Sequence, residues 1–360
     1  MASSPARALT YAAAQTARVA FYGAHYLAAR MVARDTFSDV EKPTHPMPSL
    51  AQMLASMRAL FAQDWKNVEA GLYPMPLDVL SELRRASASV RFLSDIPRVA
   101  ERRRRGGHSE VRDRDARLPR YFRQNFHFQT GGYLSEESAR LYDFQVEALF
   151  AGTADAMRRR AYVPIAQHFA RSKSRNPALL DVGAGTGRFL SFVKSVRPGL
   201  KVTALDLSQP YLDRARRTLA KHDGVDFIAA PAEAMPLPDK SVDAAVSIFL
   251  FHELPPNVRV AAAKEIARVL KPGGIFVLAE TIQYGDASEF DGLIDLFPSL
   301  LHEPYYASYA KTDLDELFAA AGLTRTATDI AYLTKIAVFE KPKRASRRRA
   351  SAANSRSRVP

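Results

Sequence analysis

The chain has 360 residues, of which 47% are hydrophobic, and a formal net charge of +13 at pH 7. This length and composition suit one full α/β domain with a substantial extra region, and they argue against wholesale disorder. Because the sequence contains no cysteine, disulfides, thiolate catalysis and cysteine-based zinc or iron–sulfur sites are excluded.

The positive charge is concentrated in two segments. Residues 341–360 contain eight Lys or Arg and no acid, and residues 98–120 contain nine Arg against four acids. These two surpluses account for the whole net charge, so we interpret 101–117 as a basic linker and 343–360 as a disordered basic tail. A weak tether to RNA or to an anionic membrane is the alternative. No nucleic-acid recognition module accompanies these segments, so no specific nucleic-acid partner is expected.

The N-terminal region is predicted to be largely helical. Residues 10–32 form an amphipathic pattern in which Arg and His interrupt every apolar run, which excludes a membrane-spanning helix. A docking helix is the first interpretation; a membrane-surface helix and an organellar presequence are the alternatives. Residues 48–66 predict a second helix capped by Ser49, and another helical run follows Pro76 towards Phe92.

The second half of the chain changes character. A dense aromatic stretch is broken by Gly131 and Gly132 and is followed by a helix that should start at Ser135. From about Pro177, short apolar runs alternate with amphipathic helical runs, which is typical of a parallel α/β sheet. The expected divisions are a helical N-terminal region, a basic linker, an aromatic and helical lead-in, a sheet domain and a basic tail, at residues 1–100, 101–117, 118–175, 176–342 and 343–360.

The segment ALLDVGAGTGRFLSFV, residues 178–193, predicts a ligand-binding turn. Its first five residues form a short buried strand, and Gly183, Gly185 and Gly187 then lead into a helix. Glycines let the backbone turn sharply and approach a ligand, and the N–H groups at the helix start face a polar group. Asp181 inside the strand suits a cation or an ammonium group, whereas it would repel a dinucleotide pyrophosphate.

A second strand, residues 202–205, ends at Asp206, nineteen residues after Gly187. A carboxylate at this place can accept two hydrogen bonds from a ribose diol. Ser208 is the expected cap of the helix that follows.

Four sequence blocks occur in order: LLDVGAGTG at 179–187, LDLS at 205–208, AEAMPLPDKSVDAAVS at 232–247 and EIARVLKPGGIFVLAE at 265–280. Together they resemble the class I S-adenosylmethionine-dependent methyltransferases, especially the methyltransferase type 11 and ubiquinone/menaquinone C-methyltransferase-like group. The resemblance implies an α/β, Rossmann-like sheet of seven strands whose last strand, near 333–339, is antiparallel. It also implies S-adenosyl-L-methionine as the cofactor and a lid formed by residues 118–175.

The resemblance also implies a set of cofactor-binding positions. Asp181 should lie near the methionine amino group, Asp206 should take the ribose hydroxyls, and Leu207 should lie against the adenine. The turn residues are Gly183, Ala184, Gly185 and Gly187, and the adenine pocket includes Ala232 and Glu233. The family commonly carries Asp before that alanine, where this sequence has Pro231. Adenine recognition would then rest on Glu233 or on the backbone.

The acceptor side is expected at the carboxyl ends of the fourth and fifth strands. His252 matches a position where related methyltransferases often carry histidine, and it is the candidate catalytic residue. It could act as a base or orient the substrate, with structural packing as the alternative. The other substrate-pocket candidates are aromatic or polar side chains, namely Tyr133, Tyr142, Phe251, Glu253, His302, Tyr305 and Tyr306. No metal site is expected.

These features predict a cytoplasmic bacterial methyltransferase that acts on a small, apolar, aromatic or lipid-like acceptor. One alternative is an RNA or protein methyltransferase that uses the basic tail, and another is a non-catalytic cofactor-binding regulatory subunit. A weak contact of the N-terminal helix or the tail with an anionic membrane is the alternative to a purely cytoplasmic location.

Overall fold

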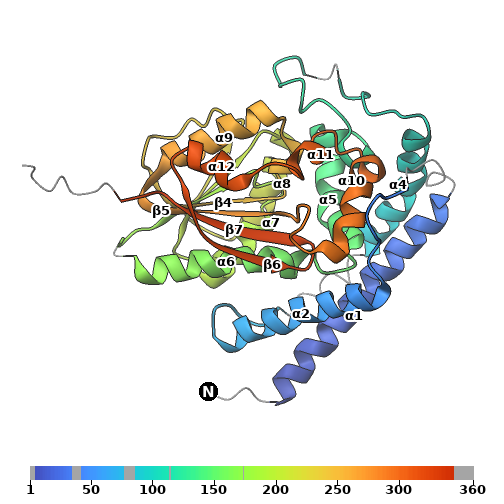
Figure 1. Ribbon diagram of the computed structural model, residues 1–360, viewed down its shortest axis with the longest axis horizontal. Helices are drawn as coiled ribbons and strands as arrows, with labels where there is room; N and C mark the ends of the chain where they lie inside the picture. Colours follow the sequence, from blue (N-terminus) through green and yellow to red (C-terminus); the bar gives the residue numbers. More distant parts are fainter. Residues whose placement is uncertain (1–4, 35–41, 77–85, 113–114, 173, 344–360) are drawn as a thin grey trace, which may run out of the picture.

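The computed structural model describes residues 5–34, 42–76, 86–112, 115–172 and 174–343 (Figure 1). The helical run expected after Pro76 is described only from residue 86. The basic tail beyond residue 343 lies outside the described residues.

The N-terminal region is helical, as expected. Its helices are α1 (Pro5–Val32), α2 (Leu50–Glu69) and α4 (Ala86–Arg104), and they lead to α5 (Glu136–Leu149) and α6 (Ala154–Arg171). The buried side chains of α1 recur every three to four residues, so the helix has one docked face; they are Tyr11, Gln15, Arg18 and Tyr22. This face packs on α4 and α5. No helix of the described residues is long and apolar enough to cross a membrane.

Seven strands form one twisted sheet in the order β3-β2-β1-β4-β5-β7-β6. They are β1 (Ala178–Val182), β2 (Lys201–Asp206), β3 (Val225–Ala229), β4 (Val242–Ile248), β5 (Leu270–Thr281), β6 (Thr324–Ala331) and β7 (Thr334–Glu340). Strand β7 is antiparallel to both β5 and β6, and the other pairings are parallel. The predicted fold class is therefore confirmed. The strand order reverses between β1 and β4, which is where open α/β sheets bind ligands.

Alternate residues of the strands bury opposite faces of the sheet. Leu179 of β1 belongs to the core that α6 and α7 (Arg188–Val196) cover, while Leu180 belongs to the core beneath α9 (Pro256–Val269) and α12 (Leu314–Ala320). Figure 1 shows α9 and α12 on one side of the sheet and α6 on the other. The central strands β1 and β4 are buried along nearly their whole length because both faces of the sheet are covered there, whereas the edge strands β3 and β6 are partly exposed. The remaining elements are α8 (Gln209–Leu219), α10 (Asp291–Leu301), α11 (Tyr306–Tyr309), and the 3-10 turns η2 (Phe126–Phe128), η3 (Gly132–Leu134), η4 (Phe251–Glu253) and η5 (Ser288–Phe290).

Polar side chains begin several helices where the sequence predicts. Ser49 forms a capping box at α2, Ser135 accepts from the N–H of Ser138 at α5, and Ser208 accepts from the N–H of Tyr211 at α8. Helix α12 is capped by Asp313, whose carboxylate accepts two backbone N–H groups at 2.8 and 3.0 Å. Of these caps, Ser208 comes two residues after the last residue of β2, so it fixes a helix start at the carboxyl edge of the sheet.

A buried ionic network anchors α1 to the sheet domain. Arg18 Nη2 lies 2.8 Å from Glu147 Oε1 and 2.9 Å from Asp155 Oδ2, and its Nε donates to the Gly152 carbonyl. Arg188, the first residue of α7, pairs with the same Asp155. The network thus joins the N-terminal helix to the helix that follows the glycine turn. Burial disfavours ionised Asp155, but the surrounding arginines hold its pKa well below the usual range.

The basic linker expected over 101–117 is folded at its start, because α4 continues to Arg104. Arg102 donates to the Phe128 carbonyl at 2.6 Å and pairs with Glu110. Its side chain is only 10% exposed. A run of arginines without apolar residues suggested a solvated segment, but the carbonyl and the carboxylate give this arginine partners that favour burial.

Candidate active site

The turn after β1 presents bare backbone at the carboxyl edge of the sheet. Gly183 N donates to the Leu205 carbonyl over 2.8 Å. Its φ is +77°, and a Cβ built there would lie 3.0 Å from Leu250 Cδ2, so glycine is required. Gly185, with a φ of +54°, faces open space, since the nearest atom to a built Cβ is Tyr211 Cδ1 at 4.0 Å. A ligand can therefore approach the backbone closely.

Asp206 stands at the end of β2, directly across from this turn. Its Oδ2 accepts from Gly185 N and its Oδ1 from Ser208 N, both over 2.8 Å. Burial raises the pKa of Asp206, and the backbone hydrogen bonds lower it again in part. Each carboxylate oxygen keeps a lone pair for a further donor, which is what binding a ribose diol requires.

Asp181 is buried in β1 with a relative exposure of 2%. Within the described parts of the chain, no group donates a hydrogen bond to its carboxylate. Burial, with a smaller contribution from Asp206, raises the pKa of Asp181 to about 8. An ammonium group bound nearby would favour the ionised form of this carboxyl and compensate its charge, so Asp181 fits a cationic ligand. The residues present therefore fit the expected cofactor, whose methionine end carries an ammonium group.

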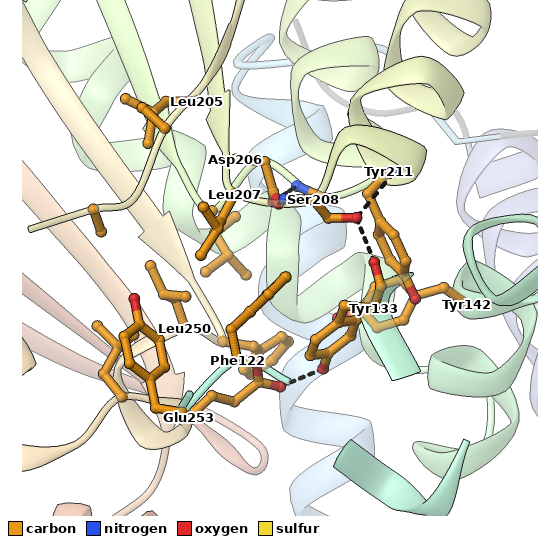
Figure 2. A pocket seen from close by; sticks show the side chains of 18 residues that line it. Phe122, Tyr133, Tyr142, Leu205, Asp206, Leu207, Ser208, Tyr211, Leu250 and Glu253 are labelled. Atoms are coloured by element: carbon orange, nitrogen blue, oxygen red, sulfur yellow. Dashed lines mark hydrogen bonds between the residues drawn. The ribbon is translucent and has the colours of Figure 1, made fainter. Parts of the chain in front are cut away.

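Figure 2 shows the pocket beside the glycine turn, with Asp206 and Leu207 on one wall and aromatic rings on the other. The space between the walls, including its open mouth, is about 630 Å³. The lining residues come from the carboxyl edge of the sheet and from the segment before it: Tyr121, Phe122, Tyr133, Tyr142, Gly183, Gly185, Leu205, Asp206, Leu207, Ser208, Tyr211, Ala230, Ala232, Ile248, Phe249, Leu250, Glu253 and Leu254.

The expected adenine end is closed by a contact between distant segments. Ala232 lines the pocket, whereas Glu233 accepts hydrogen bonds from the Tyr121 hydroxyl at 2.8 and 3.0 Å. Burial, and then the neighbouring Glu233, raises the pKa of Tyr121, so its hydroxyl remains a donor. Pro231 has no side-chain acceptor, and the Glu233 carboxylate is engaged by the Tyr121 hydroxyl.

Four aromatic rings form the opposite wall, which we call the aromatic wall: Phe122, Tyr133, Tyr142 and Tyr211. The Tyr133 ring lies between the others, with ring centroids 5.9, 6.2 and 5.3 Å from Phe122, Tyr142 and Tyr211. Ser208 Oγ donates to the Tyr133 carbonyl at 2.5 Å. The residue that caps α8 therefore also ties the aromatic wall to the cofactor side of the pocket (Figure 2).

Glu253 lies in η4, shortly after the end of β4, where it lines the pocket and belongs to a buried polar cluster. The Tyr133 hydroxyl donates to Glu253 Oε1 over 2.5 Å. Behind it, His252 Nδ1 lies 2.6 Å from Glu280 Oε2. Burial disfavours the charged imidazole, but Glu280 and Glu303 outweigh it and raise the pKa of His252 to about 10. Burial raises the pKa of Glu253.

The structure brings together only part of the residues expected from the sequence. The expected residues that line the pocket are Gly183, Gly185, Asp206, Leu207, Ala232, Tyr133, Tyr142 and Glu253. The expected residues that do not line it are Asp181, Ala184, Gly187, Glu233, Phe251, His252, His302, Tyr305 and Tyr306. Phe251 is fully buried against Phe276 and Phe318. His302 stacks on His108 with centroids 4.4 Å apart. His252 and Tyr306 are likewise buried, whereas Tyr305 packs against the aromatic cluster that includes Tyr133 and Tyr211.

The comparisons with known proteins agree with this geometry. Residues 180–278 match the sequence model of the family described as "Methyltransferase domain". Residues 180–278 are a methyltransferase domain. It is of the S-adenosylmethionine-dependent type, and the glycine turn, Asp181 and Asp206 of this domain are the groups that fit that cofactor.

Curated relatives cover this domain and little more. The demethylmenaquinone methyltransferase of Chlorobaculum tepidum is 34% identical over 151 residues, which cover 40% of this chain and 57% of the relative. The ubiquinone/menaquinone biosynthesis C-methyltransferase of Methylobacterium nodulans is 35% identical over 129 residues, covering 35% and 50%. The chain thus spans about half the length of the curated relatives it matches. Among solved structures, human N-acetylserotonin methyltransferase is 18% identical. The match covers 58% of this chain and 57% of that chain, with a TM-score of 0.44.

Sequence reasoning missed several residues around the methyltransferase domain's pocket. Tyr121 and Phe122 were visible only as members of the aromatic stretch, and Tyr211 only as a helix residue after Ser208. For Tyr211 the available signal was its position in the first turn of the helix that follows Asp206, because a residue there lies near the end of the preceding strand. His127 carried no local pattern, because it meets His252 only through the packing of distant loops. Glu303 stood out in the sequence only as a neighbour of His302, Tyr305 and Tyr306, which suggested a pocket wall and not a contact with His252.

Proposed function

We propose that this chain is an S-adenosylmethionine-dependent methyltransferase whose acceptor is a small, apolar, aromatic or lipid-like molecule. The observation that carries the proposal is the aromatic wall opposite Asp206, in the same pocket. Aromatic rings favour a flat or greasy acceptor, because they bury apolar area and stack on planar groups.

Methyl transfer from a sulfonium is an in-line displacement, so the protein mainly has to hold the two reactants in line. The bound cofactor supplies the activated methyl group. Asp181, Asp206 and the glycine turn would hold the cofactor. The aromatic wall would hold the acceptor and exclude water.

The curated relatives support the acceptor class. Two of them are named for methylation in menaquinone or ubiquinone biosynthesis, and a third is named as a malonyl-[acyl-carrier protein] O-methyltransferase. Their acceptors suggest a small molecule for this chain, and the identity of that molecule is left to the experiment below. The cytoplasmic location also stays a prediction.

We propose that Glu253 faces the acceptor and that His252 acts behind it. Glu253 lines the pocket, whereas His252 is 5% exposed and is held by Glu280. Of the roles expected for His252, this arrangement favours orienting the groups at the acceptor end over direct proton abstraction.

The test offers labelled S-adenosylmethionine and the purified protein to a cell extract, followed by separation of small molecules, lipids, RNA and protein. The Asp206→Ala variant is the matched control, since it keeps the aromatic wall but loses the ribose contact. Label in a small-molecule or lipid fraction, absent with the control variant, is the expected result. Label recovered only in RNA or protein would reject the proposed acceptor class.

A further inference from the structure

The buried polar cluster that includes Glu253 extends behind the pocket. It consists of His127 from η2, His252 and Glu253 from η4, and Glu303 after α10, and we call it the His–Glu cluster. One ring nitrogen or carboxylate oxygen from each residue lies within 4.8 Å of all the others. His127 Nε2 is 2.6 Å from Glu303 Oε1 and 3.7 Å from Glu253 Oε1. His252 Nε2 is 3.7 Å from Glu303 Oε2 and 4.0 Å from Glu253 Oε1.

One oxygen of the cluster has no partner. Glu303 Oε2 is buried without a hydrogen bond, and the Glu303 side chain is only 4% exposed. It faces the inside of the cluster, toward His252 Nε2. A buried carboxylate oxygen without a hydrogen bond costs free energy, and a ligand bound inside the cluster would compensate that cost.

A further carboxylate orients one of the histidines. Glu280 is fully buried; its Oε1 accepts from Phe251 N at 2.6 Å, and its Oε2 lies 2.6 Å from His252 Nδ1. This leaves Nε2 of His252 directed at the cluster. A carboxylate on the far nitrogen is the usual support of a metal-binding histidine, because it fixes the ring and makes the other nitrogen more basic.

The charge balance points the same way. Among the described residues, no lysine or arginine forms an ion pair with Glu253, Glu280 or Glu303; their ionic partners are His127 and His252. These carboxylates are compensated either by the two imidazoles in their charged form or by a divalent cation in the middle, which takes the place of the imidazole protons.

We propose that the His–Glu cluster binds one divalent transition-metal ion through His127, His252, Glu253 and Glu303. Two imidazoles with two carboxylates favour Mn²⁺, Fe²⁺, Co²⁺ or Zn²⁺ over Ca²⁺ or Mg²⁺, which prefer all-oxygen sites. Metal–ligand bonds of about 2.0–2.2 Å require ligand atoms roughly 3–4 Å apart, close to the separations in the cluster. This site is one that the sequence did not predict.

The position of the ion would also narrow the acceptor class, a step that rests on the proposed function. Glu253 belongs to both the cluster and the pocket, so the ion would lie behind the acceptor end of the pocket wall. The acceptor class is then one with a phenol or enol hydroxyl near its methylated part, because Glu253, oriented by the ion, can accept a hydrogen bond from such a group.

The experiment measures metal binding alone, without cofactor or acceptor. The full chain is stripped with a chelator and titrated with Co²⁺, followed by its visible d–d absorption, and then with Zn²⁺ in competition. We expect saturable binding of one ion, displacement by Zn²⁺, and a higher Tm with metal. Glu303→Gln should weaken Co²⁺ binding at least about 100-fold, and Glu280→Gln, which acts through His252, about 10–100-fold.

His302→Asn is the matched control. It is the sequence neighbour of Glu303, but its ring stacks on His108 and contacts Gln124 outside the cluster. Its φ of +47° is one that asparagine tolerates. This variant should bind Co²⁺ like the wild type. Circular dichroism and S-adenosylmethionine affinity check that each variant is folded.

Two results overturn the metal site: no saturable binding of Co²⁺, Zn²⁺ or Mn²⁺, or equal Co²⁺ affinity for a folded Glu303→Gln variant and the wild type. The cluster would then be a network that shares protons in place of an ion. Failure of the proposed function is a separate result, because S-adenosylmethionine binding and label transfer are measured independently of the Co²⁺ titration.

Discussion

At the scale of single residues, Asp206 gives the most direct test of cofactor binding. Replacing it with Ala would remove the proposed acceptor for the ribose hydroxyls and also free the N–H groups of Gly185 and Ser208. We expect Asp206→Ala to weaken S-adenosylmethionine and S-adenosylhomocysteine alike, by about 1–3 kcal/mol in calorimetry. Asp213→Ala, an exposed acid on the next helix, should leave both affinities unchanged. Equal affinity of the Asp206 variant and the wild type would remove this residue from the site.

Asp181 makes stability depend on pH. Burial raises the pKa of Asp181 to about 8, so the folded state binds its proton more tightly than the unfolded state does. The stability from this group is therefore present at low pH and lost as the pH rises through about 8. Without cofactor, Asp181→Asn should gain about 2 kcal/mol or more over the wild type at pH 9 relative to pH 5.

Calorimetric unfolding at both pH values measures this difference. Asp226→Asn, an exposed acid on β3, is the control and should change little. The idea fails if the stability difference between Asp181→Asn and the wild type is the same at both pH values.

At the scale of elements, Arg18 decides how firmly α1 is held. Its buried guanidinium pairs with Glu147 and Asp155, and Arg18→Ala would leave Glu147 with poorer compensation. We expect a loss of about 3–5 kcal/mol in the free energy of unfolding, measured with denaturant. Arg7→Ala, an exposed arginine of the same helix, should change it by less than about 0.5 kcal/mol. A small loss for Arg18→Ala would show that α1 docks without this network.

The aromatic wall is the second element with a testable role. Tyr133→Ala removes the ring that lies between Phe122, Tyr142 and Tyr211, whereas Tyr133→Phe keeps the ring and loses only the hydroxyl. Once an acceptor is found, the Ala variant should raise its KM by about tenfold or more through lost apolar contact. The Phe variant should raise KM less than the Ala variant does, because it keeps the apolar contact and loses only the hydrogen bond to Glu253. Similar KM values for both variants would contradict an acceptor bound against this ring.

At the scale of the whole molecule, the methyltransferase domain should bind its cofactor without the basic tail. Residues 343–360 contain few apolar side chains, so they have little to bury against the domain. Deleting them should leave Tm and S-adenosylmethionine affinity nearly unchanged, by thermal unfolding and calorimetry. Activity lost selectively on a nucleic-acid or anionic-lipid acceptor would favour the tether interpretation of the tail.

Much of the fold and of the cofactor site was predictable because both depend on local patterns. A strand that ends in a glycine turn, and a second strand that ends at Asp206, are written in consecutive residues with fixed geometry. Caps such as Ser135 and Ser208 mark helix starts for the same reason. The antiparallel β7 followed from the family resemblance, because the direction of a strand has no local sequence pattern.

The acceptor side was decided by the tertiary structure. His127, His252 and Glu303 are far apart in the chain and meet only because η2, η4 and the end of α10 pack together. From the sequence, His252 was a candidate base, a substrate-orienting group or a packing residue. The fold buries it in a cluster with other titratable side chains. Likewise, Arg102 looked solvated until Glu110 and the Phe128 carbonyl lay beside it. Periodicity reports which face of an element is buried, but only packing determines which polar groups share that burial.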